Sequence, residues 1–370
     1  MSLETVSEGT VSSGWTADGQ PKSLVTQPRI GVHGFLTPQH EWGDVERGNP
    51  LPYTLPPEVR KHVGLERETW QLHIAADPDT NAVVEAPFVI TFEQLLELGQ
   101  QHAVRFLKGV TCNNLGEPLG MGLWEGVPLR VLIWIAKPVS NIRRVLYHGY
   151  HNDDPRQLFQ STLPIWRVLE EPPGELPVIV AYKLNGEFIS GKRGGPVRMV
   201  VPEAYGFKSV KWLQRVLLSN EPGANDTYRL GNNELESPMK TFARFLTVPS
   251  PAAARAPIRI QGIAQVGVSG LAAVEYSIRP RGSREDDWRA GAEIIDPPPE
   301  IAGAGVLGLE NGWPMRWTIV HWVGTLDGLP AGEYELRCRS IDRNGIAQPM
   351  PRPFPKGGRA EIQSMALLVE

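Results

Sequence analysis

Cysteine is scarce in this chain. Only Cys112 and Cys338 occur among its 370 residues. A disulfide-stapled scaffold is therefore excluded, and so is a zinc ribbon, which needs cysteine pairs at short spacing. The Cys-x-x-Cys-His sequence that attaches a c-type haem is also absent. Any chemistry that cysteine supports here uses a single thiol.

Long apolar runs and an excess of charge are missing as well. The nearest candidate for a membrane span, Val127–Ala136, is shorter than the ~18 residues required and contains Arg130. The formal net charge is −4, which lacks the basic excess that follows a phosphate backbone. We therefore expect no membrane span and no nucleic-acid partner.

The N-terminal residues carry no targeting signal. Met1–Val6 lack the basic and apolar regions of a signal peptide. The expected compartment is periplasmic if a leader has been removed and cytoplasmic otherwise. Residues 1–27 are rich in Ser, Thr, Glu and Gly without periodicity, which predicts an N-terminal arm.

Glycine and proline are abundant, with 38 and 34 residues, and they separate short apolar stretches typical of strands. Two helices are expected among these strands. One is capped by Thr91, and the other runs from Gly126 to Ala136 with Pro128 in its first turn. The mixture predicts an α+β domain over residues 28–247.

The last third of the chain has a different pattern. A Pro/Ala-rich passage over residues 248–257 predicts a joint between domains. Beyond it, apolar and polar residues alternate in several short segments separated by turns. This pattern predicts an all-β sandwich of immunoglobulin type over residues 256–370, with Cys338 in its core.

Cys112 is the cysteine placed for chemistry. It follows an extended run from Arg105 and precedes a glycine-rich passage, which we interpret as a loop. A thiol where a strand opens into a loop can ligate a metal or attack a substrate. The sequence also allows a simpler interpretation, in which the thiol is merely buried.

A second cluster is cationic. Lys192, Arg193, Arg198 and Lys211 fall within twenty positions of glycine-rich backbone. Arginine in an apolar strand is costly unless it meets an anion, and bidentate binding of a phosphate is one natural use. A structural salt bridge is the alternative.

Together these segments resemble the sulfite oxidase family of molybdopterin enzymes. The resemblance rests on the single Cys112 and on four further motifs, namely residues 123–129 (LWEGVPL), 180–187 (VAYKLNGE), 195–202 (GPVRMVVP) and 209–215 (SVKWLQR). Residues 313–322 and 341–349 resemble the family's C-terminal dimerisation domain. The likeness covers about nine-tenths of the chain and implies a sulfite-oxidase-like mixed α/β molybdopterin-binding domain before the sandwich.

The resemblance implies a cofactor of one molybdenum atom held by one pyranopterin dithiolene. It makes Cys112 the protein ligand of the metal, since soft thiolates suit such an ion. It places Arg47 near the metal and Tyr228 in the substrate pocket. The remaining cofactor-binding positions that it implies are Gly48, Asn49, Asp153, Arg193, Arg198, Ser209 and Lys211.

One departure from the family pattern concerns the substrate. Sulfite-oxidising relatives commonly carry an arginine shortly after the ligand cysteine, whereas here no Arg or Lys occurs between Cys112 and Arg130. Glu117 adds a negative charge instead, and Arg47 or Arg193 is expected to compensate. The loss of one charge-assisted hydrogen bond weakens anion binding by ~1.5–3 kcal/mol.

The resemblance implies oxygen-atom transfer, with oxidation of sulfite to sulfate as the leading reaction. Because no haem motif is present, an external one-electron acceptor such as cytochrome c is expected, and the sandwich is expected to form a homodimer. Two alternatives remain open, namely reduction of an S-oxide or N-oxide at the same site, and an inactive binding protein of the same fold.

Overall fold

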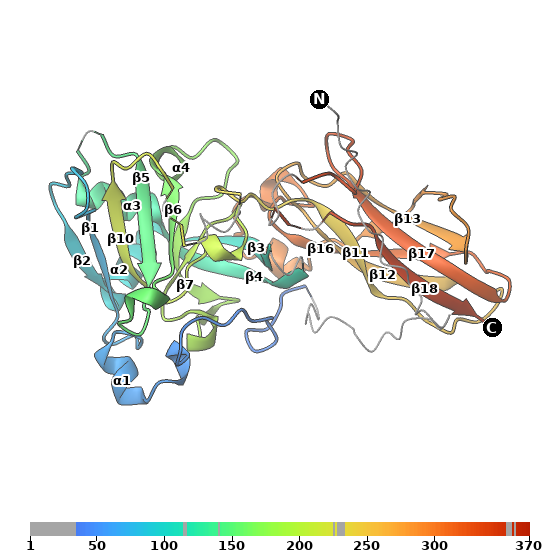
Figure 1. Ribbon diagram of the computed structural model, residues 1–370, viewed down its shortest axis with the longest axis horizontal. Coiled ribbons are helices and arrows are strands. Elements are labelled where there is room, and N and C mark those ends of the chain that lie inside the picture. Colours follow the sequence, from blue (N-terminus) through green and yellow to red (C-terminus); the bar gives the residue numbers. More distant parts are fainter. Residues whose placement is uncertain are drawn as a thin grey trace, which may run out of the picture.

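The computed structural model describes residues 35–113, 117–139, 141–224, 226–227, 234–352, 357–358 and 360–370. The expected N-terminal arm, residues 1–27, lies outside this set. Two sheets and most of the helices occupy one end of the molecule, and two further sheets occupy the other (Figure 1). The prediction of an α+β part followed by an all-β part is confirmed.

The first sheet has five strands in the order β2-β1-β10-β5-β6. Only β1 and β10 run parallel among these pairs, and the other pairs are antiparallel. Its inner face forms a hydrophobic core with α2 and α3. The strands are β1 (Gln71–Ala76), β2 (Phe88–Thr91), β5 (Arg144–Gly149), β6 (Gln160–Pro164) and β10 (Leu213–Ser219).

The second sheet carries Cys112. Its strands are β3 (Val104–Cys112), β4 (Glu117–Pro128), β7 (Ile179–Leu184), β8 (Glu187–Phe188) and β9 (Arg198–Val200), with β9 paired to β7. The helices of the same part are α1 (Pro57–His62), α2 (Phe92–His102), α3 (Leu129–Ala136) and α4 (Ile165–Leu169). Short 3-10 turns at Gly191–Arg193 and Gly206–Lys208 flank β9.

Both expected helices form, with one difference in where they begin. Thr91 caps α2 through a capping box with Gln94, as its hydroxyl predicts. The second helix, α3, starts at Leu129, and Gly126–Pro128 complete strand β4 instead. The helix therefore begins three residues later than predicted.

From Glu117 on, the glycine-rich passage after Cys112 is strand β4, so the predicted loop is wrong there; Asn113 lies in a turn, and residues 114–116 lie outside the described residues. Its glycines allow close packing rather than flexibility. A Cβ at Gly120 would lie 2.6 Å from the Trp42 ring, and one at Gly126 would lie 2.4 Å from the carbonyl oxygen of Val180. Because these glycines have no Cβ, β4 can pack closely against its neighbours on both sides.

The all-β part pairs two four-stranded sheets around a core that includes Trp322 and Cys338. Cys338 is fully buried, as predicted. One sheet contains β11 (Phe242–Thr247), β12 (Ile258–Gln265), β16 (Ile319–Leu326) and β15 (Glu293–Ile294). The other contains β14 (Arg289–Ala290), β13 (Ala273–Pro280), β17 (Gly332–Ile341) and β18 (Gln363–Val369), and helix α5 (Pro299–Ala302) lies between strands.

The passage over residues 248–257 is not the junction between the two parts. Strand β11 precedes it and pairs with β12, which follows it. The passage therefore connects two strands of one sheet, and the joint predicted there is wrong. The domain ranges 28–247 and 256–370 themselves stay predictions.

The strand that ends at Cys112 rests against the all-β part. The Gly109 amide donates to the Trp317 carbonyl at 2.8 Å, and Met121 packs with Ile263 and Ile319 in a small core of its own. Arg244 of β11 pairs with Glu117 at 2.7 Å. The pair of strands β3 and β4, here called the cysteine hairpin, is thus held by contacts with both parts of the molecule.

Replacement of Gly126 by alanine should destabilise the protein, because the new methyl group would meet backbone atoms that cannot move away. We expect the free energy of unfolding to fall by about 1–3 kcal/mol in Gly126→Ala. Gly303→Ala is the control, since its Cβ would meet only the Pro299 oxygen at 3.5 Å. Urea unfolding of both variants makes the comparison, and equal stabilities would contradict this account of β4.

Candidate active site

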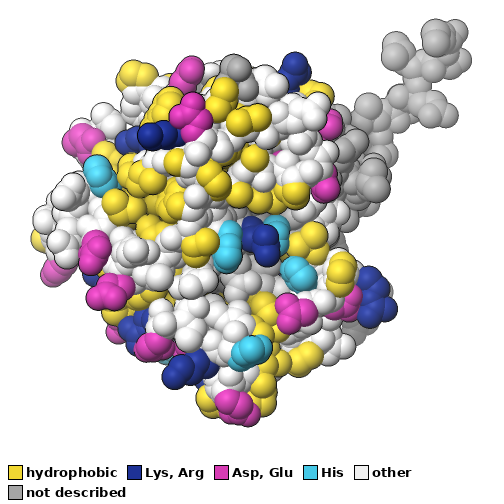
Figure 2. Space-filling model, turned by 90° about the vertical axis from the view of Figure 1, so that its left-hand side faces the viewer, with side chains coloured by type: hydrophobic (Ala, Val, Ile, Leu, Met, Phe, Trp, Pro, Cys, Tyr) yellow, Lys and Arg dark blue, Asp and Glu magenta, His cyan; other side chains and the backbone are white. Residues whose placement is uncertain are grey.

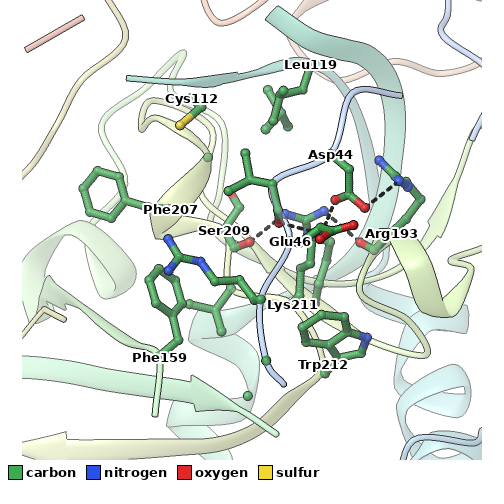
Figure 3. Close-up of a pocket in the computed structure, with 18 of the residues that line it drawn as sticks. Asp44, Glu46, Cys112, Leu119, Phe159, Arg193, Phe207, Ser209, Lys211 and Trp212 are labelled. Carbon is green, nitrogen blue, oxygen red and sulfur yellow. Dashed lines mark hydrogen bonds and ion pairs between the residues drawn. The ribbon is translucent and has the colours of Figure 1, made fainter. Parts of the chain in front are cut away.

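A cavity of about 280 Å³ lies where the end of β3, the loop after β5 and the turns around β9 meet. Cys112, Leu119 and Phe207 lie on one side of it, and Asp44, Arg193 and Lys211 lie on another (Figure 3). Four chain segments far apart in the sequence supply its walls, at residues 42–48, 110–119, 149–159 and 193–212.

Cys112 reaches the cavity because its strand ends there. The side chains from Phe106 to Thr111 are buried, whereas Cys112 is partly exposed. Its register partner is Glu117 across the hairpin. The thiol therefore lies at the edge of the core and faces the cavity.

Arg198 is held by two backbone carbonyls. Its Nη1 donates to the Arg193 oxygen at 2.8 Å and its Nη2 to the Ser209 oxygen at 2.7 Å, while the guanidinium lies 5.2 Å from the Trp124 ring centre. The residue is only 5% exposed, and burial lowers its pKa to about 9. Neutral carbonyls orient this charge without neutralising it.

Asp44 ties the other two cations together. Its carboxylate accepts a hydrogen bond from Lys211 Nζ at 2.8 Å and forms an ion pair with Arg193 Nη2 at 3.3 Å. Burial lowers the pKa of Lys211 to about 8, although Asp44 opposes this shift. One carboxylate thus serves two buried cations, and the expected structural salt bridge exists beside the expected anion site.

The cationic cluster of Arg193, Arg198 and Lys211 has unused hydrogen-bonding capacity. The Nε atoms of Arg193 and Arg198 are buried and have no hydrogen-bond partner within the described residues. Buried donors of this kind are normally satisfied, so they favour an anionic or strongly polar ligand in the cavity. A pyranopterin with its phosphate fits this chemistry, and the Cys112 thiol completes the donor set for a soft metal.

Ser209 is buried in the same wall. Its hydroxyl accepts a hydrogen bond from the Val201 amide at 3.2 Å, and its carbonyl accepts one from Arg198. The short 3-10 turn at Gly206–Lys208 places it there, together with Phe207 on the cavity wall. The structure therefore brings Ser209 into the cationic cluster, as the resemblance implied.

Arg47 belongs to the segment of residues 42–48, which forms another wall of the cavity. Its guanidinium stacks over the Phe159 ring at 4.3 Å. Burial lowers the pKa of Arg47, and the nearby Cys112 partly opposes this effect. The arginine and the thiol are therefore close enough to interact electrostatically, and Gly48 lines the cavity beside them.

Other implied residues lie elsewhere. Asn49 and Asp153 are exposed and do not line the cavity, so the structure does not place them as cofactor contacts. Lys192 is exposed too, although its carbonyl lies 3.4 Å from Lys211 Nζ. Tyr228 lies outside the described residues.

Two expectations about charge need correction. Glu117 does not oppose an anion in the cavity, because Arg244 pairs with it. Arg198 does not meet an anion alone, because two nearby backbone carbonyls already orient its guanidinium, although its charge is not neutralised. The partner of Glu117 lies 127 residues away in the sequence, whereas the carbonyls that bind Arg198 lie 5 and 11 residues away.

Sequence reasoning missed several cavity residues. The most important is Asp44, which stands one position before the segment compared with the family. Others include Trp42, Glu46, His151, Gln157, Phe159 and Trp212. The sequence signal for Asp44 was weak: a carboxylate that follows Gly43 and directly precedes the segment compared with the family.

The described residues offer neither a multi-residue metal site nor a membrane-spanning helix. The described part of the chain contains no group of three or more His, Cys, Asp or Glu side chains that could hold a metal ion. A site with a single protein ligand is consistent with this finding. No helix among the described residues is long and apolar enough to cross a membrane.

Comparison with known proteins identifies the first part of the chain. The family described as the oxidoreductase molybdopterin binding domain matches residues 59–228. Curated relatives include the NADPH nitrate reductase of Beauveria bassiana, 28% identical over 39% of this chain and 17% of that protein. The NADPH nitrate reductase of Neurospora crassa is 27% identical over 52% of this chain and 21% of that protein. The chain thus spans about a fifth of the length of these relatives.

A solved structure resembles almost the whole fold. The sulfane dehydrogenase SoxCD from Paracoccus pantotrophus covers 93% of this chain, and the match covers 85% of the SoxCD chain. The TM-score is 0.66 and the sequence identity is 20%. The likeness shows a common architecture for both parts of the molecule.

Lys211 makes stability depend on pH in a definite direction. Its pKa is about 8 in the folded cofactor-free protein and ordinarily 10.5, so the unfolded chain holds the extra proton between these values. We therefore expect the free energy of unfolding to rise as pH increases from about 8 to about 10.5.

Chemical denaturation of the cofactor-free protein across this range tests the sign. Lys211→Met should reduce the rise but not abolish it, because burial also lowers the pKa of Lys108, to about 7, whereas Lys192→Met, at an exposed lysine, should leave it intact. A fall in stability over the same range would contradict the assignment.

Proposed function

We propose that this chain, a molybdopterin oxidoreductase of the sulfite oxidase family, transfers an oxygen atom between water and a small oxyanion, with sulfite as the leading substrate. The observation that carries the proposal is the placement of Cys112 and Arg47 on the same cavity as the cationic cluster. Together they offer a soft ligand for the metal, cations that would hold the cofactor, and an arginine that would bind the anionic substrate.

The bound molybdenum cofactor supplies the two-electron redox chemistry and the oxygen transfer. Cys112 would ligate its metal, and Arg193, Arg198 and Lys211 would hold its anionic part. The net reaction is SO₃²⁻ + H₂O → SO₄²⁻ + 2H⁺ + 2e⁻. The electrons leave singly to an external acceptor, for which a c-type cytochrome is our proposed partner.

Arg47 is our candidate for binding the substrate anion. Its stacking on Phe159 fixes the guanidinium plane, and the weak hydration of a guanidinium suits a partly buried oxyanion site. Leu119 and Phe207 on the Cys112 side exclude water and strengthen the electrostatic contact. Arg47 thereby replaces the arginine that this chain lacks after Cys112.

A second candidate is reduction of an oxyanion or oxide at the same site. The nitrate reductases among the curated relatives favour it, as does the absence of a cation between Cys112 and Arg130. Steady-state assays separate the two. Turnover of sulfite with ferricyanide supports our first proposal, and turnover of nitrate with a reduced viologen in its place supports the second.

The assembly of the molecule is also a proposal. We propose that two copies pair through the all-β part, following the family's dimerisation domain, and that the molecule has two domains whose boundary lies upstream of the predicted one at residue 247. The sheet pairing of β11 favours a boundary before Phe242.

Loss of the Cys112 thiol should abolish metal retention. In Cys112→Ser we expect molybdenum content to fall from near one atom per chain to background, together with activity, while far-UV circular dichroism is unchanged. Cys338→Ser is the control, because that thiol is buried in the other core. A protein without molybdenum in the wild type would instead indicate an inactive binding protein.

Neutralising Arg47 should weaken substrate binding more than it slows the chemical step. We expect Arg47→Gln to raise KM for sulfite about tenfold or more, in line with the loss of a charge-assisted hydrogen bond. Arg67→Gln is a matched control, since Arg67 also stacks on a phenylalanine ring, at 4.7 Å, but away from the cavity. An unchanged KM in Arg47→Gln would remove its assigned role.

A further inference from the structure

A row of basic and imidazole side chains crosses the outer face of the first sheet. His73 of β1 pairs in register with Arg215 of β10, and Arg215 pairs with His148 of β5. The neighbouring residues Leu72 and Ile74 point into the core, so His73 points outward. Figure 2 shows histidine side chains on both sides of a basic side chain in the middle of this face.

A fourth residue links this row to the cavity. His151 follows β5 and lines the cavity wall. Its ring centre lies 6.0 Å from that of His148, and the two rings are tilted by 43°. A ring separation of this size leaves room for one water molecule to bridge the two imidazoles. The two imidazoles therefore connect the cavity with the outer face of the sheet.

Their nitrogen atoms are available for proton transfer. His148 Nδ1 lies 3.3 Å from the Gly149 oxygen, which can only accept, so Nδ1 carries the hydrogen and Nε2 is the basic nitrogen. His151 Nδ1 is buried and has no hydrogen-bond partner within the described residues. Neither imidazole forms an ion pair in that part of the chain.

Several charged or titratable groups surround the pair. Burial, His151 and Arg215 lower the pKa of His148, while its contact with the Gly149 carbonyl raises it. The carboxylate of Asp154 interacts electrostatically with His151. His73, Tyr150 and Asp153 are the other titratable groups of the row and its loop.

We propose that His151 and His148 form a proton relay between the cavity and solvent. This inference rests on the proposed oxygen-atom transfer, which releases two protons for each water consumed and takes up two in the reducing direction. A proton leaving the cavity protonates His151, passes through the bridging water to Nε2 of His148, and leaves from the same nitrogen to bulk water. The relay works for either direction of the reaction.

The test compares three variants of the molybdenum-loaded enzyme. We expect His151→Gln and His148→Gln to slow sulfite turnover about tenfold, to enlarge the solvent deuterium isotope effect, and to recover when imidazole is added. His73→Gln is the matched control, because it lies in the same row but two strands from the cavity. Unchanged turnover and isotope effect in both relay variants would overturn the proposal.

A second measurement does not depend on activity. Hydrogen–deuterium exchange at the imidazole C2 position, followed by mass spectrometry, gives the pKa of His148. We expect it to rise in His151→Gln, because the neighbouring imidazole that lowers this pKa is removed. An unchanged value would show that the rings are uncoupled and would overturn the relay, whereas a wild-type enzyme that turns over neither sulfite nor nitrate would contradict the proposed function instead.

Discussion

A single carboxylate shared by two buried cations is the interaction on which the site depends. Asp44 binds both Lys211 and Arg193, and thereby fastens the segment that carries Arg47 to the walls of the cavity. Arg198 beside them has only neutral carbonyls for partners. Desolvated charges of this kind are costly unless an anion joins them. The partnerless Nε atoms of Arg193 and Arg198 favour a negatively charged ligand in the cavity, although Glu46 also lines it.

The fold builds this pocket at a place where several elements end. Strand β3 ends at Cys112, strand β5 ends before His151, and two short turns flank β9. Each element is anchored in a core, so the side chains at its end are placed accurately. The walls near Cys112 are apolar and those near Asp44 are charged, so the cavity has an apolar side that carries the thiol and a charged side (Figure 3).

The sequence predicted cavity residues best where they lie within contiguous motifs. Arg198, Ser209 and Lys211 lie in contiguous motifs whose spacing fixes their place, and the structure brings all three together. Asn49 and Asp153 failed because they lie in loops, where one residue more or less turns a side chain to solvent. The pairing of Glu117 with Arg244 joins positions 127 residues apart, and no local pattern reports such a contact.

The glycines of β4 illustrate a different limit. Glycine is normally read as a sign of a turn, whereas here it permits Trp42 and the backbone of β7 to approach closely. Composition alone does not distinguish these uses, because both require a missing side chain. The distinction depends on which neighbours the completed sheet places beside the strand.

The support of the cysteine hairpin by the all-β part has a consequence for biosynthesis. Residues that brace the hairpin, among them Arg244, Trp317 and Ile319, are translated long after Cys112 itself. Since domains fold as their residues emerge from the ribosome, the thiol stays unsupported while the first part of the chain is made. The contacts that hold the hairpin of β3 and β4 from the all-β part therefore form only after that part has been translated.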